Sequence, residues 1–428
     1  MKKILILTVT AGNGHNACAK SVKARLEKES DVEVKIVDLL KSFSSPINIW
    51  TADKGYSFAV SKALWIYNII FDILKESKPK NRYKCPAQAC AVSTVAGLLQ
   101  EIVDFQPDVI YCTHFYAGIA LTDIRLVYKL PCKIIISSLD YEYSPFWEAS
   151  IGVDYFTVPN EDFVDECLKL GFKREQILPY GLPVDERASI KIDKLEARKV
   201  LGIDEKAFTI MVMFGGGYWS GGYEIFKKLL KALKHKNAQI IMINGKNKRS
   251  YNKIEKMDIP SNLKVVNVGF TDKVALYMSA SDIIINKAGG PSLTEMINQE
   301  LPMIITEKIP AQELYNLEYM KSKGTTLSFK NAKELKENVV SLMEDEDKRE
   351  KMSKNARQLK SNGIEKVVKL IMSMPNADYS ELLSEDIDFR KVKHKIKQAL
   401  NIFNRKELKI AREKEKQEKN GQKIVDLL

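Results

Sequence analysis

One local pattern occurs twice along the chain: an apolar run of strand length, a loop that contains glycine, and a helix. The first copy begins with residues 4–10, which precede a loop at residues 11–15, and the second begins with residues 208–214, which precede a loop at residues 215–222. This order is typical of parallel sheets that are covered by helices. The chain has 428 residues, and one hydrophobic core rarely organises so long a chain. We therefore predict two doubly wound α/β domains.

Further apolar runs continue the alternation of strand and helix in both halves. They cover residues 32–37, 109–112, 133–137 and 155–158 in the first half and residues 239–243, 263–268, 282–286 and 303–306 in the second. Gly and Pro interrupt the pattern at residues 180–185, which is typical of a linker. We predict a first domain over residues 1–182, a second over residues 183–374 whose last helix packs back on the first, and a connector with a basic tail over residues 375–428.

The positive charge of the chain is concentrated in this tail. The formal net charge is +12, and residues 390–428 contain thirteen Lys or Arg but five Asp or Glu. A helix predicted from residue 389 has its apolar side chains on one face, namely Phe389, Val392, Ile396, Leu400 and Phe403. A basic amphipathic helix favours an anionic membrane surface; the alternatives are a partner-binding helix, a solvated charged helix, and disorder after residue 404. Nucleic acid is not expected as a partner, because no aromatic residues interleave with the Lys residues.

Residues 58–74 also have a membrane-binding composition. If these residues form a helix, most of its circumference is apolar, with Trp65 at the centre of the segment. The polar residues Ser61, Asn68 and Asp72 form a narrow stripe along it. This predicts either a helix that dips into a lipid interface or a fully buried helix. No run is long and charge-free enough to span a bilayer, the N-terminus does not resemble a signal peptide, and six scattered Cys favour a reducing compartment. We expect a cytoplasmic protein attached peripherally to the inner face of the cell membrane.

The segment from Asn286 to Glu295 has the sequence of a phosphate-binding turn. A strand ends, two glycines turn the chain, and Pro291 stands where the first turn of a helix tolerates it. Hydroxyl groups and free N–H groups at a helix start bind phosphate oxygens. Glu295, one turn into the helix, is placed either to accept both hydrogens of a ribose diol or to act as a helix-cap carboxylate. The glycine loop at residues 215–222 predicts either a close approach to a diphosphate or a tight turn without a ligand.

A second polar cluster follows about fifteen residues later. Gln312, Glu313 and Asn316 lie within one turn of a predicted helix. Amide and carboxylate groups beside a phosphate site suit the hydroxyl groups of a sugar. The alternative is an exposed polar helix start.

Together these segments resemble the donor site of the glycosyltransferase family that contains plant monogalactosyldiacylglycerol synthases and bacterial processive diacylglycerol glucosyltransferases. The loop that ends in Gly14 and His15, the Thr-His pair at His114 and the segment from Asp140 to Trp147 resemble the acceptor side of that family. The resemblance covers about residues 1–371. It implies the GT-B fold, in which two Rossmann-like domains face a central cleft, and this chain adds a helical basic tail.

The resemblance implies a UDP-sugar donor, UDP-glucose or UDP-galactose, on the second domain and a lipid acceptor, diacylglycerol or a related lipid, on the first. The residues implied for the donor are Gly216, Gly217, Gly269, Phe270, Lys287, Gly289, Gly290, Ser292, Thr294, Glu295, Gln312, Glu313 and Asn316. Among them the loop from Gly216, with Ser292 and Thr294, is implied to bind the diphosphate, and Glu295 the ribose. The backbone near Gly269 and Phe270 is implied to contact the uracil, and Gln312 with Glu313 to bind the sugar. The residues implied for the acceptor are Gly14, His114 and Trp147.

The family inverts the anomeric configuration by direct displacement, so one base deprotonates the acceptor hydroxyl. His15 is one candidate, because histidine has a suitable pKa, and Asp140 is its rival. We expect no cofactor and no metal, because no Asp-x-Asp follows a strand. The first loop reads Gly-Asn-Gly-His instead of an unbroken glycine run, and the His expected before Trp147 is absent. Alternatives are a transferase for a polyprenyl-linked or other lipid, an epimerase of the same fold, and a non-catalytic nucleotide-sugar-binding membrane protein.

Overall fold

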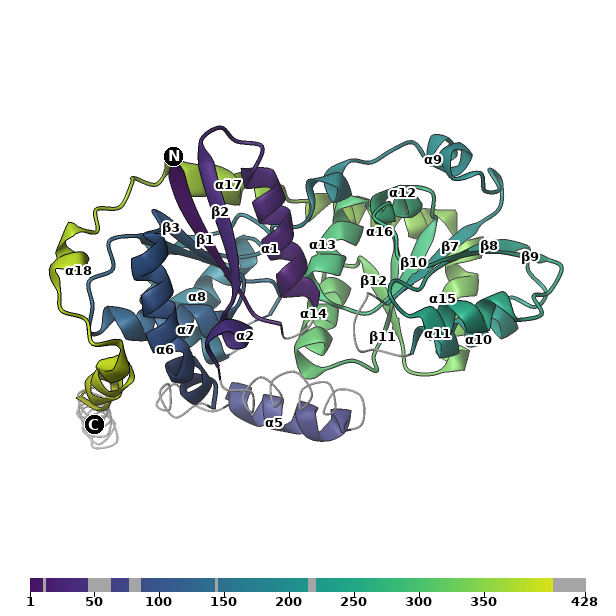
Figure 1. The fold of residues 1–428 in the computed structure, drawn as a ribbon. Coiled ribbons are helices and arrows are strands. Elements are labelled where there is room, and N and C mark those ends of the chain that lie inside the picture. Colours follow the sequence, from purple (N-terminus) through teal and green to yellow (C-terminus); the bar gives the residue numbers. More distant parts are fainter. Residues whose placement is uncertain (11–12, 45–62, 77–85, 143–144, 215–220, 403–428) are drawn as a thin grey trace, which may run out of the picture.

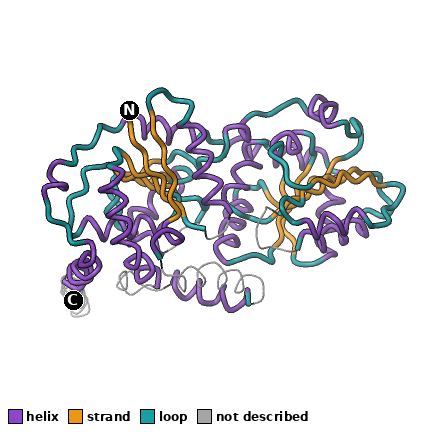
Figure 2. Tube along the Cα trace, in the orientation of Figure 1, coloured by secondary structure: helices purple, strands orange, loops and turns teal. Residues whose placement is uncertain are grey.

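The computed structural model describes residues 1–428 except for 11–12, 45–62, 77–85, 143–144, 215–220 and 403–428. It contains two six-stranded sheets, one in each half of the chain, and every strand pair in them is parallel. Figure 2 shows the two groups of strands with helices around each. The prediction of two doubly wound α/β units is confirmed.

The first sheet has the order β2-β1-β3-β4-β5-β6. Its strands are β1 (Lys2–Thr8), β2 (Val32–Asp38), β3 (Val109–Cys112), β4 (Lys133–Ser137), β5 (Tyr155–Thr157) and β6 (Ile177–Leu178). The helices of this half are α1 (Asn13–Leu26), α2 (Leu39–Phe43), α5 (Leu64–Glu76), α6 (Pro86–Phe105), α7 (Phe115–Arg125) and α8 (Val164–Leu170). Strand β3 is buried at every position, as expected for a parallel strand with helices on both faces of its sheet.

The second sheet has the order β12-β11-β10-β7-β8-β9. Its strands are β7 (Thr209–Met213), β8 (Ala238–Ile243), β9 (Leu263–Val268), β10 (Ile283–Asn286), β11 (Met303–Thr306) and β12 (Thr326–Phe329). The helices of this half are α9 (Lys194–Leu201), α10 (Gly222–Ala232), α11 (Lys248–Glu255), α12 (Val274–Ser279), α13 (Gly290–Asn298), α14 (Ala311–Ser322), α15 (Ala332–Glu344) and α16 (Glu346–Gln358). Read from β9, this is the strand order of the Rossmann fold.

Each sheet has a point where the direction of strand addition reverses. In the first sheet it lies between β1 and β3, and in the second between β7 and β10. The loops that leave two such strands run to opposite sides, so a crevice opens between them at the carboxyl ends, and ligands of this fold bind there. The segments that start at these points are α1 and α7 in the first domain and α13 in the second. The starts of α1, α7 and α13 therefore lie where the topology favours a ligand, while residues 215–220 of the second glycine loop lie outside the described residues.

Helix α17 (Gly363–Ser373) follows the second domain in sequence but packs on the first (Figure 1). Its apolar side shares a buried cluster with β1 and α1, which includes Ile4, Ile6, Ala19, Val22, Ile364, Val367, Val368 and Ile371. Arg25 of α1 donates two hydrogen bonds to the carboxylate of Glu365, from Nε at 2.9 Å and from Nη2 at 2.7 Å. The chain thus returns to the first domain and ties the two halves together.

The tail begins with α18 (Ser380–Ser384) and continues as a helix over residues 389–402, which we call the tail helix. The helix predicted there is present as far as it is described. Its apolar residues Val392, Ile396 and Leu400 are at most 7% exposed and belong to the hydrophobic cluster of the first domain. Protein therefore covers the apolar face of the tail helix, and the predicted contact with an anionic membrane stays a prediction for its basic side chains. Its Lys and Arg side chains point to solvent.

Candidate active site

Two histidines meet where β1 and β3 end. His15 lies in the first turn of α1, and His114 is the N-cap residue of α7. Because β1 and β3 are neighbours, the two rings are close, with centroids 4.5 Å apart and planes at 64°. The Nδ1 atom of His15 is 2.5 Å from the carbonyl oxygen of Thr113. The Nδ1 atom of His114 accepts a 3.2 Å hydrogen bond from the backbone N–H of Tyr116.

These partners fix the tautomer of each neutral ring. A carbonyl oxygen can only accept, so the proton of His15 is on Nδ1 and its lone pair is on Nε2. Removal from water lowers the pKa of His15, while the charge of Asp140 and the bond to Thr113 act in the opposite direction. Burial also holds the pKa of His114 well below its usual value, and His15 adds to this effect. At neutral pH His15 is therefore an uncharged base whose Nε2 carries the lone pair.

Asp140 joins the first domain to the second. It follows β4, and its Oδ1 accepts a 2.8 Å hydrogen bond from Nδ2 of Asn316 in α14. The Asn316 amide also donates to the carbonyl of Ala288 at 3.0 Å and accepts from the backbone N–H of Tyr141 at 2.6 Å. Asn316 is fully buried. The structure thus gives Asn316 a role different from the predicted one. Its amide forms hydrogen bonds with protein groups of both domains and links them, so it is not available to bind a sugar.

Helix α13 begins directly against the first domain. A Cβ atom at Gly290 would lie 1.9 Å from the carbonyl oxygen of Leu139 and 3.1 Å from Cα of Asp140, so a side chain cannot fit unless the backbone moves. A Cβ atom at Gly14 in α1 would lie 3.3 Å from Cγ of Pro291. The N-termini of α1 and α13 therefore meet, and the backbone N–H groups of their first turns, which have no partner within their own helix, lie near the junction. Such helix ends favour anions.

The predicted sugar-binding residues lie beside this junction. Lys287 follows β10 and forms an ion pair with Oε1 of Glu313 in α14, close to Gly289. The other carboxylate oxygen of Glu313, Oε2, is buried and has no hydrogen-bond partner among the described residues. A buried acceptor that lacks a donor fits the hydroxyl group of a ligand. The neighbouring Gln312 accepts a 2.8 Å hydrogen bond at Oε1 from the hydroxyl of Tyr67 in α5.

The two hydroxyl residues of α13 have different surroundings. Thr294 is fully buried, its Oγ1 donates to the carbonyl of Gly290 at 3.0 Å, and the same oxygen is 2.8 Å from the hydroxyl of Tyr141. Thr294 faces the first domain, so the structure does not support its predicted contact with a diphosphate. Ser292 is partly exposed near the start of the helix. It remains a predicted diphosphate ligand.

Glu295 and the end of β9 supply the remaining predicted donor contacts. Glu295 is partly exposed, and removal from water raises its pKa to about 7, with a smaller contribution from the charge of Asp185. Gly269 and Phe270 follow β9, and the Phe270 ring is 73% exposed with Nζ of Lys246 5.7 Å from its centroid. These positions are accessible, and their roles toward ribose and uracil stay predictions.

Trp147 is a predicted acceptor residue that does not line the junction. Trp147 is 6% exposed and packs on Phe115 and Phe156, with ring centroids 6.0 and 4.8 Å apart. It belongs to the core of the first domain and offers little surface to an acceptor, so its predicted acceptor contact is not supported. Gly216 and Gly217 lie outside the described residues.

Two tyrosines at the junction are absent from the predicted site. Tyr141 contacts Asn316 and Thr294 of the second domain, and Tyr67 contacts Gln312. Tyr141 is adjacent in sequence to Asp140, but nothing in a single tyrosine indicates a contact between domains. The sequence does contain an indication for Tyr67, because it lies beside the narrow polar stripe of an otherwise apolar helix. If the apolar side of such a helix faces lipid, the polar stripe is expected to face protein.

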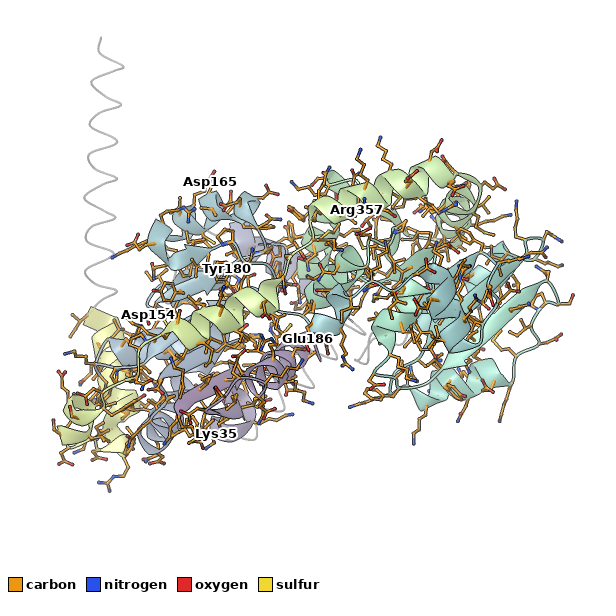
Figure 3. The ribbon with its side chains drawn as sticks, turned by 90° about the horizontal axis from the view of Figure 1, so that it is seen from above. Lys35, Asp154, Asp165, Tyr180, Glu186 and Arg357 are labelled. Atoms are coloured by element: carbon orange, nitrogen blue, oxygen red, sulfur yellow. The ribbon has the colours of Figure 1, made fainter. Side chains whose placement is uncertain are left out.

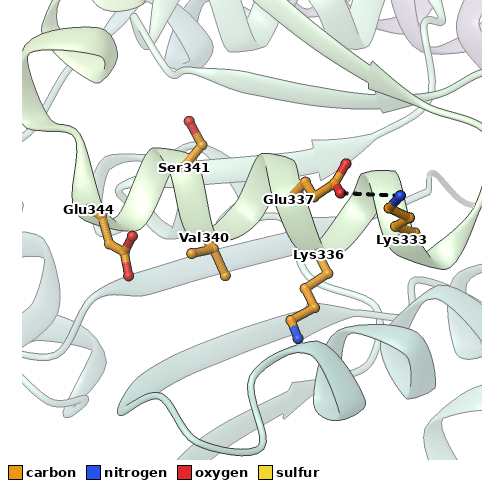
Figure 4. Close-up of a pocket in the computed structure, with 6 residues that line it drawn as sticks. All are labelled: Lys333, Lys336, Glu337, Val340, Ser341 and Glu344. Atoms are coloured by element: carbon orange, nitrogen blue, oxygen red, sulfur yellow. Dashed lines mark ion pairs between the residues drawn. The ribbon is translucent and has the colours of Figure 1, made fainter.

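A surface hollow elsewhere on the molecule is unrelated to this site. It lies along α15 and is lined by Lys333, Lys336, Glu337, Val340, Ser341 and Glu344 (Figure 4). All six belong to one helix on the outside of the second domain, and Lys333 pairs with Glu337 at 4.0 Å. None of the predicted residues lines it. The predicted site therefore lies at the junction of the domains and not in this hollow.

Two Rossmann-type domains that meet at helix N-termini have the architecture of glycosyltransferases of the GT-B class. The family model of monogalactosyldiacylglycerol (MGDG) synthase matches residues 15–184, and the model of the glycosyltransferase family 28 C-terminal domain matches residues 211–371. The chain belongs to this family of monogalactosyldiacylglycerol synthases and diacylglycerol glucosyltransferases.

Individual relatives agree with this assignment. Monogalactosyldiacylglycerol synthase 1 of Arabidopsis thaliana is 29% identical over 386 residues, which cover 86% of this chain and 70% of the relative. Processive diacylglycerol beta-glucosyltransferase of Staphylococcus epidermidis is 26% identical over 326 residues, which cover 76% and 80%. The crystal structure of Acinetobacter baumannii MurG has the same fold, with a TM-score of 0.55, 15% identity, and coverage of 87% of this chain and 100% of that chain.

Proposed function

We propose that this protein moves a hexose from UDP-glucose or UDP-galactose to diacylglycerol or a glycosyl-diacylglycerol at a membrane surface, with inversion at the anomeric carbon. The names of the relatives support the substrate class. The observation that carries the proposal is the place of Asp140. It acts through its charge on His15, and it accepts a hydrogen bond from Asn316, one turn after Glu313 in α14. The proposed base and the proposed sugar-binding carboxylate thus belong to one connected group.

The second domain is proposed to hold the donor. The N–H groups at the start of α13 and Ser292 would face the diphosphate, Glu295 the ribose, and the backbone after β9 the uracil. Lys287 and Glu313 would hold hydroxyl groups of the hexose, since Oε2 of Glu313 lacks a partner among the described residues. We propose that no metal is needed, because the helix dipole and Lys287 supply positive charge where the UDP leaving group departs.

The first domain is proposed to supply the base. Nε2 of His15 takes the proton of the acceptor hydroxyl while that oxygen forms a bond to the anomeric carbon. The bond from the anomeric carbon to the β-phosphate oxygen breaks, and its electron pair leaves with UDP. One displacement of this kind inverts the configuration. The carboxylate of Asp140 favours the charged imidazolium that forms, and the imidazolium later releases its proton to solvent.

Two surfaces support attachment to an anionic membrane. Helix α5 exposes an apolar face, with Trp65 68%, Ile66 41%, Ile69 51% and Ile73 62% exposed. The tail helix exposes Lys and Arg, and Figure 1 shows both helices along the lower side of the molecule. Of the two alternatives for the apolar segment, this exposure favours the lipid interface. No helix in the described part of the chain combines the length and apolar character that a bilayer span requires.

The test is a transfer assay with vesicles. Protein is incubated with labelled UDP-glucose or UDP-galactose and vesicles that contain diacylglycerol, with and without EDTA, and the lipid products are separated. We expect one labelled sugar to enter a glycolipid with or without EDTA. Glu295→Ala should lose donor binding. Binding of a UDP-sugar without transfer to any lipid would favour the non-catalytic alternative and contradict the proposal.

A further inference from the structure

Helix α5 belongs to the first domain in sequence, but its polar side contacts the second domain at the start of α14. The contacts involve Asn68 and Asp72, which stand four residues apart and so share a side of the helix, and Tyr67, which precedes Asn68. The opposite side is the exposed apolar face. A surface helix normally turns its apolar side to the protein. In α5 Phe71 is buried near Tyr315 of α14, but Trp65, Ile66, Ile69 and Ile73 are exposed to solvent, which is expected when their side of the helix meets lipid.

The side chain of Asn68 forms hydrogen bonds with the backbone at the beginning of α14. Its Oδ1 accepts a 2.8 Å hydrogen bond from the backbone N–H of Ala311, the first residue of the helix, and its Nδ2 is 3.4 Å from the carbonyl oxygen of Ile309. The N-cap residue of α14 is Pro310, which offers no side-chain hydrogen bond. One of the unpaired N–H groups of the first turn is therefore satisfied by a residue from another domain.

The next two contacts fix side chains on the same helix. The hydroxyl of Tyr67 donates to Oε1 of Gln312 at 2.8 Å, so the amide of Gln312 is held in one orientation. One turn later the hydroxyl of Tyr315 donates to Oδ1 of Asp72 at 3.0 Å. The first turn of α14 carries Gln312 and Glu313, the residues proposed to hold the donor hexose.

We infer that Tyr67 and Asn68 are positioning residues for the donor sugar, and that a lipid surface which binds the apolar face of α5 strengthens donor binding through them. This inference rests on the proposed function. α5 is seated in its contacts with α14 when its opposite face is covered by lipid, and it then holds Gln312 and Glu313 in the geometry that the sugar needs. Donor binding and membrane binding assist each other by the same factor.

The experiment measures the affinity of the full chain for UDP-glucose and UDP-galactose by calorimetry, with and without vesicles of anionic phospholipid that contain no diacylglycerol. For the wild type we expect vesicles to tighten binding of the preferred donor about fivefold, the size expected for one helix-capping interaction. Asn68→Ala should abolish this gain and raise the donor KM without a matching fall in kcat. Asn68→Asp keeps a capping oxygen and should restore most of it. Tyr67→Phe should raise the KM for the sugar nucleotide but leave affinity for UDP unchanged.

Ile69→Ser is the matched control on the apolar face of the same helix. It should weaken vesicle binding and leave donor affinity in the absence of vesicles unchanged. If Asn68→Ala binds the donor like the wild type with and without vesicles, the inference is wrong even if transfer to lipid is observed. If the wild type binds no UDP-sugar at all, the proposed function itself fails. A vesicle effect of equal size in wild type and Asn68→Ala would also overturn the inference.

Discussion

The amide nitrogen of Asn316 lies 2.8 Å from the carboxylate of Asp140, so a residue of the second domain holds a residue that acts through its charge on the histidine of the first. This hydrogen bond connects the two domains, each of which is built on its own sheet. It means that the orientation of Asp140 depends on the second domain being in place. Contact between the two domains therefore sets the orientation of the carboxylate that acts through its charge on His15.

Replacing Asn316 by Asp tests this link. The new carboxylate would face Asp140 and lose the donation that Nδ2 makes, so the two acids would repel each other and the domains would separate. We expect kcat/KM to fall about 10- to 100-fold, the equivalent of a charged hydrogen bond of about 1.5–3 kcal/mol. Steady-state assays check this, with Ser292→Ala as a control that should raise donor KM and leave the base unaffected. An Asn316→Asp enzyme with wild-type kinetics would contradict the link.

The pH dependence of His15 is the second prediction. Because desolvation lowers its pKa, the ring stays neutral below the usual value of about 6.5. At saturating donor, where the ionisation of Glu295 no longer limits binding, the acidic limb of kcat should therefore have its midpoint below pH 6.5, and activity should fall as the pH drops through it. His15→Gln should remove this limb and lower kcat by about 10²–10⁴-fold while donor affinity is kept. Unchanged turnover in that variant would assign the base to Asp140.

Donor binding should depend on the ionisation of Glu295. Its pKa is raised to about 7, and only the carboxylate accepts both ribose hydroxyl groups. Between pH 8 and pH 6 the affinity for UDP-glucose should fall about tenfold as the group takes up a proton. UDP-glucose is the suitable ligand because its diphosphate is a diester without a pKa in this range. Glu295→Gln should bind weakly and show no such slope in calorimetry.

Much of the fold follows from the sequence. The strands at 109–112, 133–137, 263–268 and 303–306 have the predicted bounds. Three of them are apolar runs that a parallel sheet buries on both faces, whereas the strand at 263–268 is a partly exposed edge strand. β6 and β12 were not predicted. β6 has two residues and exists through its pairing with β5, and β12 is an edge strand that alternates polar and apolar residues after a glycine. Such strands depend on a neighbour that a local pattern does not contain.

The site was predictable where chemistry is local and not where it depends on contacts between domains. His15, Lys287 and Glu313 lie at the junction because strand, loop and helix start specify them. Asn316 and Thr294 have residue types that suit a ligand, but the first domain uses their polar groups. Tyr141 and Thr294 are in contact although they lie about 150 positions apart, and a single sequence contains no pattern that predicts such a contact.

Glu300 provides a prediction for stability. It follows α13 with a φ of 56° and accepts bonds from Arg357 at 2.8 Å, Lys191 at 2.9 Å and Lys360 at 3.1 Å; Figure 3 labels Arg357 on α16. The bond from Arg357 above all lowers the pKa of Glu300 to about 2. The ionised Glu300 therefore adds to the free energy of unfolding at pH values above 4.5, the pKa of the group in the unfolded chain. This stabilisation is lost as the pH falls towards 2. Glu300→Gln should lower the free energy of unfolding by about 1.5–3 kcal/mol at pH 7, and this difference should shrink below pH 4.5 in denaturant titrations.

Substitutions on the two faces of the tail helix should affect different properties: those on the buried face should lower stability, and those on the basic face should weaken membrane binding. Ile396 is fully buried against the first domain, whereas Lys393 and Lys397 are exposed. Ile396→Ala should lower the free energy of unfolding by about 2–5 kcal/mol, because it leaves a cavity in the core. The double change Lys393→Gln and Lys397→Gln should leave the melting temperature unchanged and weaken binding to anionic vesicles by about 2 kcal/mol at low salt, since each Lys near the surface contributes roughly 1 kcal/mol. The difference should vanish at high salt. If the double variant sediments with vesicles like the wild type at low salt, the basic face of the tail does not touch the membrane, and attachment rests on α5.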